Sequence, residues 1–239
     1  MMKAAADLHI HSCLSPCASR DMTPNNIVNM AMVKGLDMIA VCDHNHTGNL
    51  KAVSEIARAA GILFIPGLEL ETSEEIHLLC YFPSVNSILQ LQSELNQYYQ
   101  HIPNREDIFG PQWILDENDN LQEKINFLLT VSTTLDLYQA VSLVRGLGGV
   151  PVPAHVDRQS YSILSNLGSI PQDLNLNTLE LSRYTARDCF VREHPEYAEK
   201  RFITSSDAHD LGMILERSVF IELEELSAAC LLEKLKAEH

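Results

Sequence analysis

Ala4-Ala5-Ala6-Asp7-Leu8-His9-Ile10-His11 is a short apolar run that ends in two histidines. Side chains two residues apart on a strand point the same way, so His9 and His11 project together from the end of a strand predicted over residues 4–11. Similar apolar runs follow along the chain, and each is predicted to be a strand. They cover residues 38–42, 63–70, 76–82, 150–155, 178–181, 202–204 and 218–223.

Stretches of helical period lie between these strands. Thr23-Pro24 gives a capping residue followed by proline at the first turn, so a helix is predicted to begin there and to end near Gly35. A second helix is predicted over residues 50–60, with Gly61 at its end. Strand–helix–strand order of this kind predicts an α/β fold with a mostly parallel sheet, either open or closed into a barrel.

Residues from about 84 to 147 interrupt this alternation. A helix is predicted over residues 88–99, a small hairpin over 112–115 and 121–125, and a further helix over 135–147. The chain of 239 residues has the length of one α/β barrel. We therefore expect a single domain, residues 1–239, that carries an insertion at about 84–147.

Composition and charge narrow the class of protein. The formal net charge is −15, with 17 basic residues against 32 acidic ones, which disfavours a general nucleic-acid-binding surface. No apolar run approaches the roughly 18–20 residues that span a bilayer, and the N-terminus turns polar at Asp7 before a signal peptide could form. Six irregularly spaced cysteines do not indicate a disulfide framework. We expect a cytoplasmic enzyme without a membrane partner.

Histidine and acidic residues recur at the strand ends. A lone histidine near a strand is usually a structural residue, but a set of this kind is hard to explain in that way. The carboxyl ends of parallel strands converge on one face, where ligands bind. Mixed imidazole and carboxylate sets suit Zn, Mn or Fe, so the sequence predicts a metal site. The set comprises His9, His11, His44, Glu69, His77, His155, Asp207 and His209.

In this order the residues resemble the motifs of the PHP (polymerase and histidinol phosphatase) superfamily. The matching segments are His9-Ile10-His11-Ser12, Asp43-His44, Gly67-Leu68-Glu69, His77, Ala154-His155 and Ser206-Asp207-Ala208-His209. The resemblance covers essentially the whole chain and is weakest over residues 84–147. It implies a distorted (β/α)7 TIM-like barrel with two to three divalent ions at the C-terminal ends of its strands.

The resemblance also implies a role for each residue of the set. One ion would be held by His9, His11, Glu69 and Asp207, and Glu69 would bridge to a second ion held by His77 and His155. His44 and His209 would hold a third ion, together with a ligand in the stretch 13–21. This stretch departs from the common pattern, and Asp21 is the predicted ligand, with Cys17 as the less favoured substitute. Glu69, Asp207 and His209 are the predicted catalytic residues.

The predicted activity is hydrolysis of a phosphoric ester, preferably a phosphomonoester, by a hydroxide held between two ions. The expected substrate is a small phosphorylated metabolite or nucleotide, and no stable nucleic-acid binding is expected. Asp43 is predicted to orient a ligand histidine, and Arg158 and Arg183 to bind the phosphate. Two alternatives stay open, namely an amidohydrolase-type reaction on a non-phosphate substrate and a non-catalytic accessory PHP module. The sequence predicts no particular oligomeric state.

Overall fold

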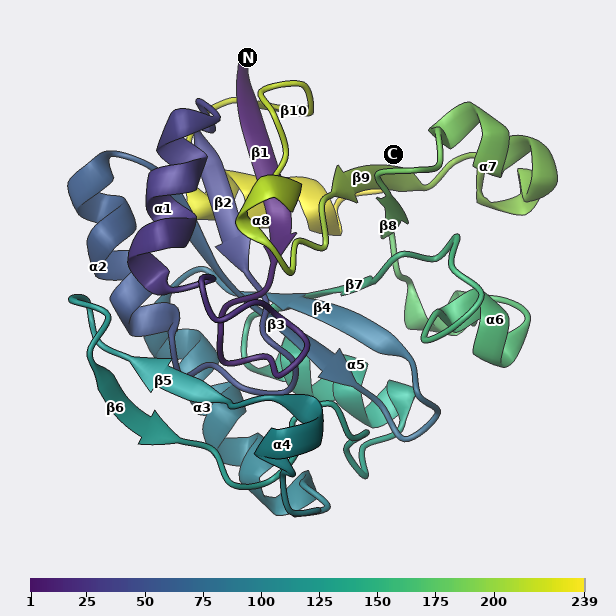
Figure 1. Cartoon of the computed structure of the whole chain (residues 1–239). Coiled ribbons are helices and arrows are strands. Elements are labelled where there is room, and N and C mark those ends of the chain that lie inside the picture. The colour runs from purple at the N-terminus through teal and green to yellow at the C-terminus, as the bar shows by residue number, and fades with distance from the viewer. Residues whose placement is uncertain (239) are drawn as a thin grey trace.

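The computed structural model describes residues 1–238, and a curled sheet in the order β10-β1-β2-β3-β4-β7 is its central feature (Figure 1). Two further strands, β8 and β9, form a separate parallel pair. The bounds are β1 (Met2–Ile10), β2 (Met38–Val41), β3 (Leu63–Glu71), β4 (His77–Tyr81), β7 (Val150–Pro153), β8 (Thr178–Ser182), β9 (Arg201–Ser205) and β10 (Phe220–Leu223). All eight strands predicted from the sequence are present, and no end differs by more than two residues.

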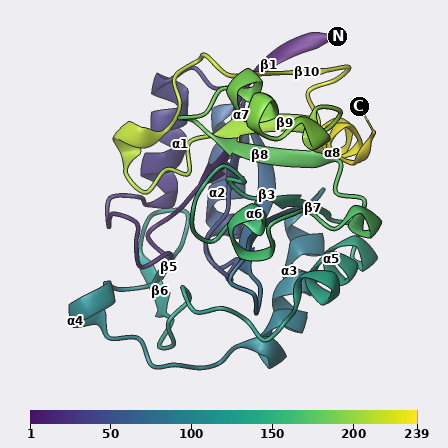
Figure 2. The ribbon, with the colours of Figure 1, turned by 90° about the vertical axis from the view of Figure 1, so that its right-hand side faces the viewer.

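Hydrogen bonds beyond the regular ladders connect the β8–β9 pair to both sides of the large sheet. At one side the backbone N–H of His11 donates to the carbonyl of Ala208 (2.9 Å), just beyond β9. At the other side the N–H of Val156, just beyond β7, donates to the carbonyl of Glu180 in β8 (2.9 Å). Seven strands therefore surround one interior, and Figure 2 shows β8 and β9 side by side. This arrangement confirms the predicted distorted (β/α)7 TIM-like barrel, with β10 added antiparallel to β1.

One strand of the barrel runs in the opposite direction to the others. β4 is antiparallel to both of its neighbours, with His77 opposite Glu71 of β3 and Leu78 opposite Pro153 of β7. The first residue of β4 thus lies at the edge where the parallel strands have their last residues. This reversal explains why His77 is the first residue of its strand, whereas the other histidines of the predicted set lie near the last residue of a strand or beyond it.

The interior of the barrel holds small and branched side chains from alternate strand positions. Ala4, Ala6 and Leu8 of β1 pack there against residues of β2, β3, β4 and β7. Helix α8 (Ala228–Lys236) adds three buried leucines, Leu231, Leu232 and Leu235, to the same cluster. The hydroxyl of Thr178, the first residue of β8, donates to the carbonyl of Leu235 (2.7 Å). α8 therefore closes the end of the barrel at which the parallel strands begin.

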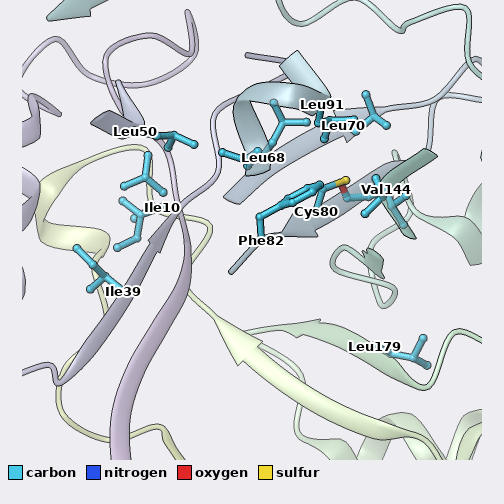
Figure 3. Packing of buried hydrophobic residues seen from close by; sticks show 14 of the residues in the cluster. Ile10, Ile39, Leu50, Leu68, Leu70, Cys80, Phe82, Leu91, Val144 and Leu179 are labelled. Atoms are coloured by element: carbon cyan, nitrogen blue, oxygen red, sulfur yellow. The ribbon is translucent and has the colours of Figure 1, made fainter. Parts of the chain in front are cut away.

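A second apolar cluster lies between the sheet and the outer helices α1 (Pro24–Val33), α2 (Leu50–Ala60), α3 (Val85–Leu95) and α5 (Leu137–Gly146). Figure 3 shows Leu50, Leu91 and Val144 of three of these helices among strand residues such as Leu68 and Cys80. α1 begins as predicted, with the Thr23 side chain accepting from the N–H of Asn26. None of the helices in residues 1–238 has the length and apolar character that crossing a bilayer requires.

The segment between β4 and β7 packs against loops at the C-terminal end of the barrel. After α3 it contains η1 (Asn96–Tyr98), α4 (Glu106–Phe109) and the hairpin of β5 (Trp113–Leu115) and β6 (Leu121–Lys124). The N–H of Trp113 donates to the carbonyl of Cys13 (3.2 Å), and the N–H of Leu115 donates to Oδ1 of Asn49 (2.8 Å). This segment, which contains the predicted hairpin, thus builds a wall on the α1–α2 side of that end.

The opposite side of the same end is formed by loops with short helices. α6 (Ile163–Leu167) and η2 (Gln172–Leu174) follow β7, whereas α7 (Arg187–Glu193) and η3 (Pro195–Tyr197) follow β8. η4 (Leu211–Met213) lies between β9 and β10. Figure 1 shows α6 and α7 away from α1 and α2, beyond the strands β7, β8 and β9.

Candidate metal centre

The carboxylate of Glu69 lies among five imidazole rings at the C-terminal end of the barrel. Glu69 is buried, and the distances from its oxygens to the nearest imidazole nitrogens range from 2.9 to 3.3 Å. The distances are 3.3 Å to Nε2 of His9, 3.2 Å to Nε2 of His11, 3.2 Å to Nδ1 of His44, 2.9 Å to Nδ1 of His77 and 3.2 Å to Nε2 of His155. A single carboxylate thus contacts five imidazoles, which come from the ends of four strands, β1, β2, β4 and β7.

Asp207 and His209 complete the group on one side. Oδ1 of Asp207 lies 3.1 Å from Nε2 of His11 and 3.4 Å from Nε2 of His9. The ring of His209 stacks on that of His11, with centroids 4.3 Å apart. We refer to His9, His11, His44, Glu69, His77, His155, Asp207 and His209 as the Glu69 cluster.

An irregularity in β1 turns both of its histidines toward Glu69. Asp7 pairs with Ile39 and Ile10 pairs with Val41, so β1 has one extra residue between these pairs. Leu8 consequently packs in the barrel interior, whereas Ile10 packs in the outer cluster. His9, which lies within the irregular stretch, and His11, directly after β1, both contact Glu69. A bulge of this kind re-aims side chains next to a functional site.

Two members of the Glu69 cluster have left-handed backbone conformations. The φ angle is 30° at His155, just after β7, and 50° at Asp207, just after β9. This region is costly for residues other than glycine, and such strain concentrates at functional sites. The left-handed turns end the strands and bring both side chains into the cluster.

Three groups within the cluster have ligand atoms close enough together to hold a metal ion. They are His9-His11-Glu69-Asp207, His44-Glu69-His77 and His11-His44-His209. Within residues 1–238, Nδ1 of His44 and Oε2 of Glu69 are buried and have no hydrogen-bond partner, although they lie 3.2 Å apart. Leaving such atoms unpaired costs roughly 1–3 kcal/mol each. Their convergence fits a cation, and the donor set suits Zn, Mn or Fe.

Burial and neighbouring charges set the protonation of the cluster. Burial alone would raise the pKa of Glu69, but His77 and His9 lower it well below its ordinary value. Burial alone would lower the pKa of His9, but Glu180 and Glu69 raise it well above its ordinary value. Burial lowers the pKa of His44 well below its ordinary value. Glu69 is therefore anionic and His44 neutral, which are the forms that bind metal ions.

Asp43 supports the cluster through a serine, in agreement with its predicted orienting role. Its carboxylate accepts hydrogen bonds from the N–H and hydroxyl of Ser12 (2.8 and 2.6 Å) and from the hydroxyl of Ser15 (2.7 Å). Oγ of Ser15 in turn lies 3.0 Å from Nδ1 of His11. The Asp43–Ser15–His11 chain directs Nε2 of His11 toward Glu69.

The predicted ligand in the stretch 13–21 lies outside the cluster. Asp21 is exposed and belongs to none of the three ligand groups found within residues 1–238. Asp21 lies in a turn in which the N–H of Met22 donates to the carbonyl of Ser19. Cys17 is also exposed and also outside these groups.

The two predicted phosphate-binding arginines lie in different surroundings. Nη1 of Arg158 is 2.6 Å from Oδ2 of Asp207, so Arg158 borders the cluster directly. Arg183 instead donates to the carbonyl of Met213 (2.9 Å) and to the hydroxyl of Tyr184 (2.9 Å). Only Arg158 therefore contacts a member of the Glu69 cluster.

Sequence reasoning missed three residues that contact the cluster. Glu180 lies against Nδ1 of His9, Glu71 lies 3.7 Å from Nε2 of His77, and the ring of Tyr161 stacks on that of His77 with centroids 4.9 Å apart. Glu180 lies between Leu179 and Leu181 in β8, and a single acidic residue between two leucines was the available signal. Tyr161 lies in a loop and gave no comparable signal.

Parts of this chain are similar in sequence to segments of three other proteins. An uncharacterised protein of Methanocaldococcus jannaschii is 33% identical over 101 residues, 42% of this chain and 12% of that protein. A 5'-3' exoribonuclease of Haemophilus influenzae is 29% identical over 99 residues, 38% of this chain and 35% of that protein. A 3',5'-nucleoside bisphosphate phosphatase of Chromobacterium violaceum is 34% identical over 70 residues, 29% of this chain and 24% of that protein. The chain thus matches about a third or less of the length of these relatives.

Solved structures share the fold over nearly the whole chain. A lesion-specific endonuclease of Pyrococcus furiosus matches with a TM-score of 0.66 and 18% identity, covering 98% of this chain and 56% of that one. An amidohydrolase of Chromobacterium violaceum matches with a TM-score of 0.63 and 19% identity, covering 97% of both chains. The family model described as "PHP domain" matches residues 7–141, which contain four of the five histidines around Glu69. The chain belongs to the PHP domain family.

Proposed function

We propose that the protein is a metal-dependent phosphoesterase that hydrolyses a small phosphorylated substrate, with a phosphomonoester favoured. The contact of one buried carboxylate, that of Glu69, with five imidazoles carries the proposal. A carboxylate in such surroundings is suited to bridge two divalent ions. Ions held by the Glu69 cluster would lower the pKa of a bound water and neutralise charge on a phosphoryl group.

The protein's own residues supply the remaining requirements of this reaction. Asp43 and Glu180 hold His11 and His9 in place from outside the cluster. Arg158 adds a guanidinium beside Asp207, at the edge of the cluster, where it could pair with phosphoryl oxygens. The three proposed ligand groups share His11, Glu69 and His44, so ions bound there would act on one substrate group. These observations support two to three ions, with Glu69, Asp207 and His209 at the reacting centre.

The surroundings of the cluster support a small substrate. The β5–β6 segment packs on the Cys13 and Asn49 side, so the cluster is walled on one side. The net charge of −15 opposes extended contact with a phosphate backbone. A structure of endonuclease Q, which shares the fold at 18% identity, was solved with a 27-mer duplex. Duplex DNA therefore belongs among the substrates to be tested, although we expect no stable binding.

The proposal is tested with purified protein reconstituted separately with Mn, Zn and Fe. Each sample is assayed against phosphomonoesters, phosphodiesters, a short oligonucleotide and duplex DNA, and released phosphate or fragments are measured. We expect phosphate release from at least one small monoester. Absence of release from every ester with every metal would overturn the phosphoesterase assignment.

Metal content provides a second readout that does not depend on activity. We expect the His9→Ala/His11→Ala double variant to bind less metal than the unaltered protein. A His101→Ala/His194→Ala double variant is the matched control, because neither histidine belongs to the Glu69 cluster. Equal metal content in the unaltered protein and the His9/His11 variant would refute the proposed ligand set.

A non-phosphate reaction is the second candidate, and the amidohydrolase with the same fold makes it worth testing. The same reconstituted samples are therefore assayed against amides and lactones. Hydrolysis of these compounds without any phosphoester hydrolysis would favour this alternative. Full metal occupancy with no hydrolysis of either class would favour a non-catalytic accessory module.

A further inference from the structure

A cavity of about 550 Å³ lies beside the Glu69 cluster, between the loop after β7 and the loop after β8. One of the residues that line it is Val156, which directly follows His155 of the cluster. The volume lies within the range of about 300–1,000 Å³ that is typical of small-molecule sites.

Arg158 connects this cavity to the cluster. It lines the cavity, and its Nη1 lies 2.6 Å from Oδ2 of Asp207. The wall is held in place by Asp157, whose carboxylate accepts hydrogen bonds from the N–H and hydroxyl of Ser182 (2.7 and 2.5 Å). A phosphate at the cluster and a group in the cavity would therefore both lie next to Arg158.

Tyr184 presents an aromatic ring at the cavity wall. The residue is 75% exposed, which is unusual for so large an aromatic side chain. The guanidinium of Arg183 lies over the ring at 5.0 Å from its centroid and is itself anchored on the carbonyl of Met213. Arg183 thus fixes the tyrosine from one face, and most of the remaining ring surface is available for a planar ligand.

The rest of the cavity combines apolar and polar surfaces. Phe190 is buried and Leu164 is half-buried, so the lining includes apolar contacts. Gln159, Ser165 and Glu193 are exposed and offer hydrogen-bond donors and acceptors. A flat heteroaromatic group with polar edges fits this combination better than a purely polyhydroxylated sugar does.

We propose that this cavity binds the nucleobase and sugar of a nucleoside monophosphate whose phosphate lies at the Glu69 cluster. The inference rests on the proposed phosphoesterase function and narrows its substrate class. Stacking on Tyr184 provides affinity that tolerates different bases, because every base has a π face. In this arrangement Arg183 acts by positioning Tyr184, and Arg158 contacts the phosphate.

The test compares AMP with ribose 5-phosphate, which carries the same phosphate and sugar without a base. The measured quantity is the ratio of kcat/KM for AMP to kcat/KM for ribose 5-phosphate. We expect this ratio to fall about 10-fold in Tyr184→Ala, since base–aromatic stacking contributes about that factor or more, and to be retained in Tyr184→Phe. Tyr138→Ala removes another exposed tyrosine, one that does not line this cavity, and serves as the matched control.

An unchanged ratio in Tyr184→Ala, or an equal fall in Tyr138→Ala, would overturn the assignment of the cavity. If neither of these two esters is hydrolysed, the full ester panel decides the proposed function, and titration with adenosine tests the cavity by itself. Adenosine binding that weakens in Tyr184→Ala and persists in Tyr184→Phe would support the nucleoside site. Absence of adenosine binding to the unaltered protein would refute it.

Discussion

Glu180 places its carboxylate against Nδ1 of His9, with its two oxygens 3.2 and 3.1 Å away. One of these oxygens also accepts the backbone N–H of His155 at 3.0 Å. The contact favours a proton on Nδ1 of His9, so a metal ion bound on the side of Glu69 and Asp207 would displace only the proton on Nε2. One buried acid thus orients one histidine of the Glu69 cluster and the backbone of another.

Replacing Glu180 with glutamine tests this positioning role. Glu180→Gln keeps the size of the side chain but weakens the acceptor, so we expect metal affinity to fall about 10- to 100-fold. Competition titration with a chelator measures the affinity, and Glu123→Gln in the exposed strand β6 is the control. If Glu180→Gln binds metal as tightly as the control, Glu180 has no part in holding the ligand.

Arg158 is expected to act on the substrate more than on the metal. In Arg158→Gln we expect KM for a phosphomonoester to rise about 10-fold or more, because a charge-assisted contact with the phosphate is lost. Metal content, measured in parallel, should change little, since no proposed ligand is removed. Arg192→Gln, on the last turn of α7 and outside the cavity lining, serves as the control. A fall in metal content without a change in KM would show that Arg158 supports Asp207 instead.

The glycine of the Gly67-Leu68-Glu69 motif is required by packing. A Cβ at residue 67 would collide with Sγ of Cys42 and lie 3.2 Å from the carbonyl oxygen of Val41. We expect Gly67→Ala to lower the free energy of unfolding by about 1–3 kcal/mol, the usual cost of overpacking. Urea denaturation measures the change.

The same collision offers an internal check on this prediction. Removing the sulfur in Cys42→Ala should make the second substitution less costly, so the Cys42→Ala/Gly67→Ala double variant should show favourable coupling. Gly212→Ala is the control, because nothing lies within 4 Å of a Cβ at that position. Additive effects in the double variant would contradict the proposed collision.

Asp37 is expected to make folding stability depend on pH. Burial alone would raise its pKa, but hydrogen bonds from Arg217 and from the N–H of Ala5 lower it below 3.8. A carboxyl group with a lower pKa in the folded state stabilises the fold above its unfolded pKa, and this contribution disappears as pH falls through the folded pKa. Asp37→Asn should therefore cost up to about 1 kcal/mol at pH 7, since the pair is partly exposed and screened.

Urea denaturation of Asp37→Asn and the unaltered protein at pH 7 and at pH 3 measures this dependence. The difference between the two proteins should shrink at the lower pH, because the stabilisation from the Asp37 carboxylate begins to be lost once the pH falls below the ordinary pKa of the group. Asp188→Asn, in a largely exposed ion pair with Arg187, is the control. A difference that stays constant between the two pH values would show that Asp37 acts through its shape and not its charge.

Local patterns in the sequence determined most of the architecture. Alternation of apolar runs with helical stretches predicted all eight barrel and edge strands, and the Thr23-Pro24 and Gly61 signals located helix ends. Residue types at strand ends predicted which side chains meet around Glu69. These features follow from neighbours in the chain, because strand and helix periods and capping preferences act over a few residues.

Only the tertiary structure decided how these elements combine. The reversed direction of β4 brings His77 to the ligand edge, the extra residue in β1 turns His9 inward, and Glu180 reaches His9 from a strand 171 residues away in sequence. The tertiary structure also decided that Asp21 is exposed and that Arg183 contacts Met213 and not the cluster. Strand direction, bulges and contacts between distant residues depend on which strands pair and pack, and no local period of the chain encodes that pairing.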